Sequence, residues 1–184
     1  MKNNSVEGYI LANERNMRIT EAVCDAWEQA RQSVVKVLLE RLRTNFAKQL
    51  PHWQFEPFGR FFEDTIAGFS LSKPNWKYYW INLQCEDKGK SIVIGVVRDF
   101  NLLGKRPLHP KLLEAVRSKV PSARSRKWWW EALVKIRSPA EDWSTPEALW
   151  QMYKDKCFAD DVAEQVVTVA KASERILDRL SRRK

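Results

Sequence analysis

The segment that constrains the fold most is residues 76–99, because it predicts two β-strands joined by a short turn. In residues 78–85, apolar side chains alternate with more polar or aromatic ones, as in a strand with two different faces. Residues 92–97 form a β-branched run, which also favours a pleated sheet. Between them, Gly89 can adopt a positive φ, as a tight hairpin turn requires. We therefore expect a hairpin at the centre of the sheet.

The composition is that of a folded domain, with 44% hydrophobic and 30% charged residues in a chain of 184. We expect a polar N-terminal extension over residues 1–18 and a single α+β domain over residues 19–184. The three cysteines are far apart and the chain has two histidines, so neither a disulfide framework nor a zinc site is indicated. With no signal segment and no long apolar run, we expect a cytoplasmic protein that does not bind membranes.

Apolar residues at three- and four-residue spacing predict a long amphipathic helix over residues 20–49, with Thr20 as its N-cap and Pro51 as its stop. Further strands are expected at 52–58, 66–71 and 128–136, and further helices at 111–120, 145–156 and 161–180. The economical arrangement is an antiparallel sheet of about four strands, with the long N-terminal helix and the C-terminal helices packed mostly on one side.

The net charge of +9 is concentrated in two segments of the sequence. Residues 105–137 hold ten Lys or Arg against two Glu, and residues 171–184 hold six against two acidic residues. Such asymmetry is typical of a surface that binds the phosphate backbone of DNA or RNA, or an acidic protein surface. A solvated basic face without a ligand is the alternative.

Three consecutive tryptophans lie within the first of these segments, and in a strand Trp129 would face away from Trp128 and Trp130. An exposed indole beside cations can stack on an unpaired base. Buried indoles would instead fill the core. The candidate residues for binding a nucleic acid or a partner are Lys105, Arg106, Arg117, Lys119, Arg124, Arg126, Lys127, Trp128, Trp129 and Trp130.

A second pattern, Glu86 with Lys88, has the E-x-K spacing that places a carboxylate and an ammonium on one face of a strand. With Asp64 as a second ligand, Glu86 could hold Mg²⁺ while Lys88 stabilises a scissile phosphate. The alternative is that both are solvated residues of the hairpin turn. We favour no catalytic residue and no cofactor, and Mg²⁺ enters only under this nuclease hypothesis.

From about Leu39 onward, the chain has a characteristic order of segments. It runs through a long helix, the segments WQFEPF and KPNW, a hairpin, an IGV strand, the WWW run, a DW loop and a long terminal helix. This order resembles the C-terminal region of a family of PD-(D/E)XK nuclease-related proteins of prokaryotes and phages. The resemblance implies a link with nucleic acids or host defence. In such proteins the catalytic carboxylates and lysine lie in a preceding nuclease core, for which we expect no room in this chain.

The leading hypothesis is a non-catalytic, nucleic-acid- or defence-associated binding module that uses a basic, tryptophan-rich surface. One alternative is a Mg²⁺-dependent nuclease of the PD-(D/E)XK type. Another is a protein-binding inhibitor or subunit of phage or plasmid origin, whose tryptophans anchor the contact. A homodimer is a further hypothesis.

Overall fold

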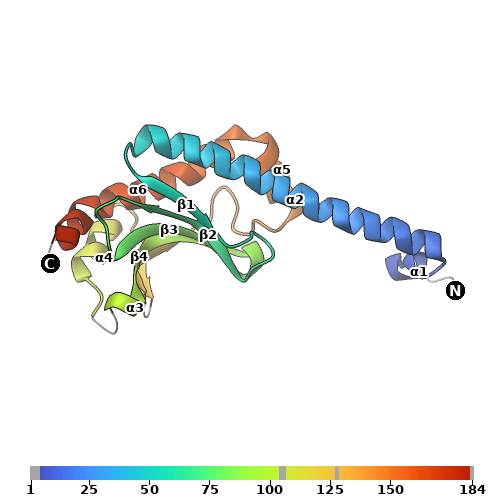
Figure 1. Cartoon of the computed structure of the whole chain (residues 1–184), viewed down its shortest axis with the longest axis horizontal. Helices are drawn as coiled ribbons and strands as arrows, with labels where there is room; N and C mark the ends of the chain where they lie inside the picture. The colour runs from blue at the N-terminus through green and yellow to red at the C-terminus, as the bar shows by residue number, and fades with distance from the viewer. Residues whose placement is uncertain (1–4, 104–106, 127–128, 183–184) are drawn as a thin grey trace.

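The computed structural model describes residues 5–103, 107–126 and 129–182, and its elements form a sheet with helices packed on one face (Figure 1). The α+β class, the long N-terminal helix and the antiparallel sheet agree with the prediction. The prediction of about four strands is wrong, because the sheet has six. One of them is a three-residue strand, Arg124–Arg126, whose polar side chains give no apolar alternation by which to recognise it.

The strands follow the order β1-β2-β3-β4-β6-β5 across the sheet, and all neighbouring pairs are antiparallel. The predicted hairpin is present, and its arms β3 and β4 are neighbours in the interior of the sheet. Its turn is a short 3₁₀ segment in which Gly89 has a φ of 95°. The strands are β1 Gln54–Phe58, β2 Ile66–Ser72, β3 Tyr79–Glu86, β4 Ser91–Arg98, β5 Arg124–Arg126 and β6 Trp130–Lys135.

The long N-terminal helix and the C-terminal helix begin several residues earlier than predicted, at Glu14 and Lys156. The long helix begins at Glu14, because the side chain of Asn13, rather than that of Thr20, caps it. The helix predicted at 145–156 begins at Pro146, and the side chain of Thr145 caps it. The helices are α1 Val6–Ile10, α2 Glu14–Gln49, α3 Phe100–Leu103, α4 Pro110–Arg117, α5 Pro146–Lys154 and α6 Lys156–Arg182.

The main core lies between one face of the sheet and the helices α2, α4, α5 and α6. Leu42 from α2, Val166 from α6 and Ile94 from β4 are fully buried in it. The other face carries a smaller apolar cluster, in which Trp80 packs against buried residues that include Trp130. The sheet therefore has one face covered by helices and one face with its own small cluster.

The N-terminal part of α2 runs past the edge of the sheet, and α1 lies against its far end (Figure 1). The first buried residue of α2 is Val35, so more than half of this helix contributes no buried side chain to the core. The amide of Asn16 donates to the carbonyl of Tyr9 at 2.7 Å and joins the two helices. These helices form a projecting hairpin at the end of the molecule opposite the C-terminus.

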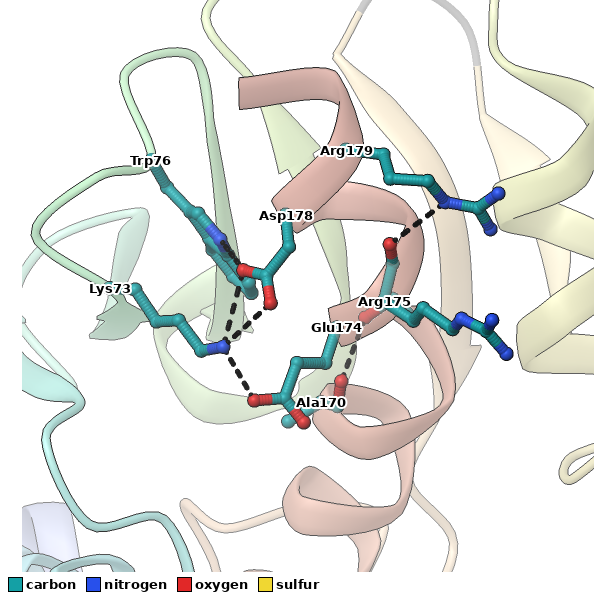
Figure 2. Close-up of polar contacts among 8 residues, drawn as sticks. Lys73, Trp76, Ala170, Glu174, Arg175, Asp178 and Arg179 are labelled. Carbon is teal, nitrogen blue, oxygen red and sulfur yellow. Dashed lines mark hydrogen bonds and ion pairs between the residues drawn. The ribbon is translucent and has the colours of Figure 1, made fainter. Parts of the chain in front are cut away.

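The loop between β2 and β3 is attached to α6 by a polar cluster (Figure 2). The ammonium of Lys73 lies 2.6 Å from the Glu174 carboxylate and 2.9 Å from that of Asp178. Arg175 and Arg179 point away from this cluster, toward the opposite side of the helix. The cluster thus fixes which side of α6 faces the loop, and Arg175 and Arg179 lie on the other side.

Candidate nucleic-acid interface

The C-terminal end of α4 and the beginning of β5 form one basic surface. The guanidinium Nε of Arg117 donates to the carbonyl of Ala123 at 2.8 Å, so the end of the helix is tied to the start of the strand. The side chains of Arg117, Lys119 and Arg124 are exposed. Because Arg124 lies on β5, the last strand in the order, this basic surface lies beside an edge of the sheet.

Arg126 has a carboxylate partner, unlike its neighbour Arg124. Its Nη1 lies 2.6 Å from an oxygen of Glu86, the same oxygen that accepts a hydrogen bond from the Gln84 amide at 3.3 Å. Among the described residues, Arg117, Lys119 and Arg124 make no ion pair. An external anion would therefore bind Arg117, Lys119 and Arg124 more readily than Arg126, whose charge is already paired with Glu86.

The two described tryptophans of the WWW run have different environments. Trp130 is 1% exposed and lies in the small apolar cluster, whereas Trp129 is 43% exposed. Trp130 pairs with Arg126, so Trp129 lies close to the end of β5. An exposed indole thus adjoins the basic edge. The candidates Lys105, Arg106, Lys127 and Trp128 lie outside the described residues.

The second basic segment of the sequence, in α6, lies next to the first. Helices α4 and α6 are in contact, and a hollow of about 140 Å³ between them is lined by Lys111 from α4 and Arg179 from α6. His109, just before α4, also lines it. The two segments are far apart in the sequence, and no sequence pattern indicated that they would meet. Their positive charge is gathered at the end of the molecule opposite the projecting hairpin (Figure 1).

A buried ion pair supports the chain beside this surface. The guanidinium of Arg98 lies 3.5 Å from the carboxylate of Glu131, and their side chains are 5% and 1% exposed. Burial raises the pKa of Glu131, although the backbone N–H of His109 and the charge of Arg98 partly oppose that rise. Arg98 also donates to the carbonyl of Pro107 at 3.3 Å. The pair therefore connects the segment just before α4, residues 107–109, to the beginning of β6.

A polar hollow of about 480 Å³ opens near the sheet face that the helices leave uncovered. Asn82 and Gln84 from β3 line it together with Trp80, and the hydroxyl of Ser70 donates to the Asn82 side chain at 2.8 Å. Amide donors and acceptors beside an indole can bind a planar polar group such as an unpaired base. These residues were not predicted to belong to a binding site. The only sequence signal they give is the alternation of polar and apolar residues in residues 78–85, which predicts a strand and not a site.

The proposed nuclease residues do not share a site in this structure. Glu86 binds Arg126, as described above. Asp64 accepts a hydrogen bond from the backbone N–H of Arg60 at 2.7 Å, within its own loop. Lys88 lines a separate hollow between the hairpin turn and α2. The described part of the chain contains no group of three or more His, Cys, Asp or Glu side chains placed to hold a metal ion.

In the ranges that the structure describes, no helix is both long enough and apolar enough to cross a membrane. Comparisons of the chain with protein-family models, with curated proteins and with solved structures found no match.

Proposed function

We propose that this protein binds nucleic acid, without cleaving it, through the basic end formed by α4, β5 and the C-terminal part of α6. The observation that carries the proposal is the meeting of two basic segments, with Lys111 and Arg179 lining one hollow. Phosphate groups of a nucleic-acid backbone are spaced closely enough to bind several such cations at once. The resemblance to nuclease-related proteins points to the same class of ligand and to host defence as its setting.

The exposed side chain of Trp129 favours single strands within this proposal. An indole next to cations can stack on an unpaired base while the cations bind the adjacent phosphates. Inside a duplex, the faces of each base pair are already stacked on the neighbouring base pairs, so an indole cannot stack on them. We therefore expect the protein to bind both forms at low salt and to prefer a single strand.

The test is a salt titration of fluorescence anisotropy with labelled single- and double-stranded DNA and with single-stranded RNA of the same sequence. Binding should weaken linearly on a plot of log affinity against log salt concentration, as counterion release requires. A protein that does not bind at low salt, or whose affinity does not respond to salt, contradicts the proposal.

A pair of matched variants tests the location of the site. The double substitution Arg175→Ala with Arg179→Ala should weaken binding and reduce the salt slope by about two, because two phosphate contacts are lost. Arg15→Ala with Arg18→Ala removes the same charge from the projecting hairpin and should leave the slope almost unchanged. Equal losses in both variants would mean that net charge alone, and not this surface, determines binding.

A further inference from the structure

The projecting hairpin, made of α1 and the N-terminal part of α2, exposes large apolar side chains along much of its length. Trp27 is 44% exposed and Val23 is 62% exposed, although both lie in the middle of a regular helix. In a monomer these side chains would stay in water and contribute nothing to stability. The large apolar residues exposed here are Val6, Tyr9, Leu11, Met17, Ile19, Val23 and Trp27.

Within α2, three of these residues form a stripe along one side of the helix. Ile19, Val23 and Trp27 follow one another at four-residue steps, so they lie one above the other on the helix. The small residues Ala26 and Ala30 are exposed beside them. A face that alternates large and small side chains can receive the large side chains of an identical face, as an interface with two-fold symmetry requires.

Ion pairs within the hairpin reduce the charge repulsion between two identical copies. Glu14 and Arg18 pair at 2.6 Å, and Arg31 and Glu28 pair at 2.7 Å, along the helix itself. Residues 5–31 hold five acidic against three basic residues, in a chain whose net charge is +9. The stripe is thus apolar and lies on a hairpin of slightly negative net charge, which disfavours nucleic acid as its ligand and repels a second hairpin only weakly at physiological salt.

We propose that the stripe docks against the same stripe of a second copy, with the two α2 helices antiparallel. The hairpin extends past the sheet (Figure 1), so an antiparallel pair would place the two folded bodies at opposite ends of the paired helices. A standard interface buries about 800 Å² on each partner. The three large side chains of the stripe, Ile19, Val23 and Trp27, contribute about 300 Å² at about 100 Å² each, and Ala26, Ala30 and the polar residues beside them along the two paired helices contribute the rest. Trp27 and Val23 lie near the middle of the paired helices.

Sedimentation equilibrium of the full chain over a wide concentration range tests the proposal. The wild-type protein should sediment with twice the mass of one chain, and Val23→Glu and Trp27→Glu should each shift it to the monomer. Trp150→Glu is the matched control, because Trp150 is 61% exposed on α5 and lies outside the hairpin, so its substitution should leave the dimer intact. Circular dichroism of each variant establishes that the helices remain folded.

Crosslinking gives a second readout that does not depend on a destabilising charge. Cys24 is exposed on α2 next to Val23, and Cys157 is exposed on α6. In a Cys157→Ser background, a short bismaleimide should join two copies through Cys24. A wild-type chain that stays monomeric at every concentration, or a dimer that survives both glutamate substitutions, overturns the proposal. The first outcome would point to a different protein as the occupant of the stripe.

Discussion

The indole nitrogen of Trp76 donates a hydrogen bond of 2.8 Å to a carboxylate oxygen of Asp178, and so joins the loop before β3 to the last helix (Figure 2). The same carboxylate pairs with Lys73 at 2.9 Å. A substitution of Asp178 by Ala removes both bonds and leaves a buried indole N–H without its partner. We expect it to lower the free energy of unfolding by about 2 kcal/mol, the usual size of a charged hydrogen bond plus an unsatisfied donor.

Urea unfolding measures this loss, and Asp161→Ala is the matched control, because the exposed Asp161 side chain on the same helix forms no ion pair with another described residue. The control should change the free energy by less than about 0.5 kcal/mol. Equal losses for the two variants would mean that the contact between Trp76 and Asp178 does not hold α6 in place.

The same cluster predicts how stability depends on pH. Burial alone would raise the pKa of Asp178, but the hydrogen bonds from Trp76 and Lys73 outweigh it, and the pKa is lowered. Burial alone would lower the pKa of Lys73, yet the carboxylates of Glu174 and Asp178 raise it. The contribution of Asp178 is therefore complete above its unfolded pKa of about 3.9 and is lost as the pH falls through its lower folded pKa.

The contribution of Lys73 is complete below its unfolded pKa of about 10.4 and is lost as the pH rises through its higher folded pKa. The difference in unfolding free energy between the wild type and Asp178→Asn should thus be constant over neutral pH and shrink below about pH 4. Urea titrations of both proteins across the acid range check this. A difference that grows on acidification would contradict the assigned direction of the Asp178 shift.

The buried pair of Arg98 and Glu131 predicts strong coupling between two substitutions. Glu131→Met alone leaves a buried guanidinium without its carboxylate, which should cost about 3 to 5 kcal/mol. Arg98→Met alone leaves the buried Glu131 carboxylate without the positive charge of Arg98. The double variant removes both charges and should be clearly more stable than the sum of the single losses predicts. A double-mutant cycle by urea unfolding measures the coupling, and additive losses would show that the two side chains act independently.

The parts of the fold that were predicted correctly are those with a strong local pattern. The alternation in residues 78–85 and the β-branched run 92–97 determine which face of each strand is apolar, and Gly89 permits the turn between them. The three-residue strand β5 has no such pattern, because its polar side chains join the sheet only through backbone bonds to β6.

The candidate site was only partly predictable for a related reason. Arg117 and Arg124 could be recognised because they are close together in a basic segment. Arg179 joins them through the packing of α6 against α4, a contact between residues distant in the sequence. The pairing of Arg126 with Glu86 likewise depends on tertiary structure, and it leaves the Glu86 carboxylate engaged by an arginine.

That pairing allows one variant to separate two functions. Glu86→Gln removes the anion beside Arg126, so an additional cation becomes available to phosphate, and binding to DNA at low salt should tighten severalfold. If Glu86 instead held a catalytic Mg²⁺, the same variant would abolish cleavage that the wild type performs in Mg²⁺. Anisotropy and a DNA cleavage assay on both proteins distinguish these outcomes. Unchanged affinity would remove Arg126 from the binding surface.

Trp129 provides the sharpest test of the preference for single strands, because its indole is 43% exposed whereas Trp130 is buried beside it. Trp129→Ala removes a stacking surface but no charge. It should weaken binding to single-stranded DNA by about tenfold, the size expected for one stacked base, and leave duplex binding and the salt slope nearly unchanged. Trp150→Ala is the control for loss of an exposed indole elsewhere, and it should bind like the wild type. If Trp129→Ala weakened both ligands equally, the indole would act by supporting the basic edge rather than by stacking on a base.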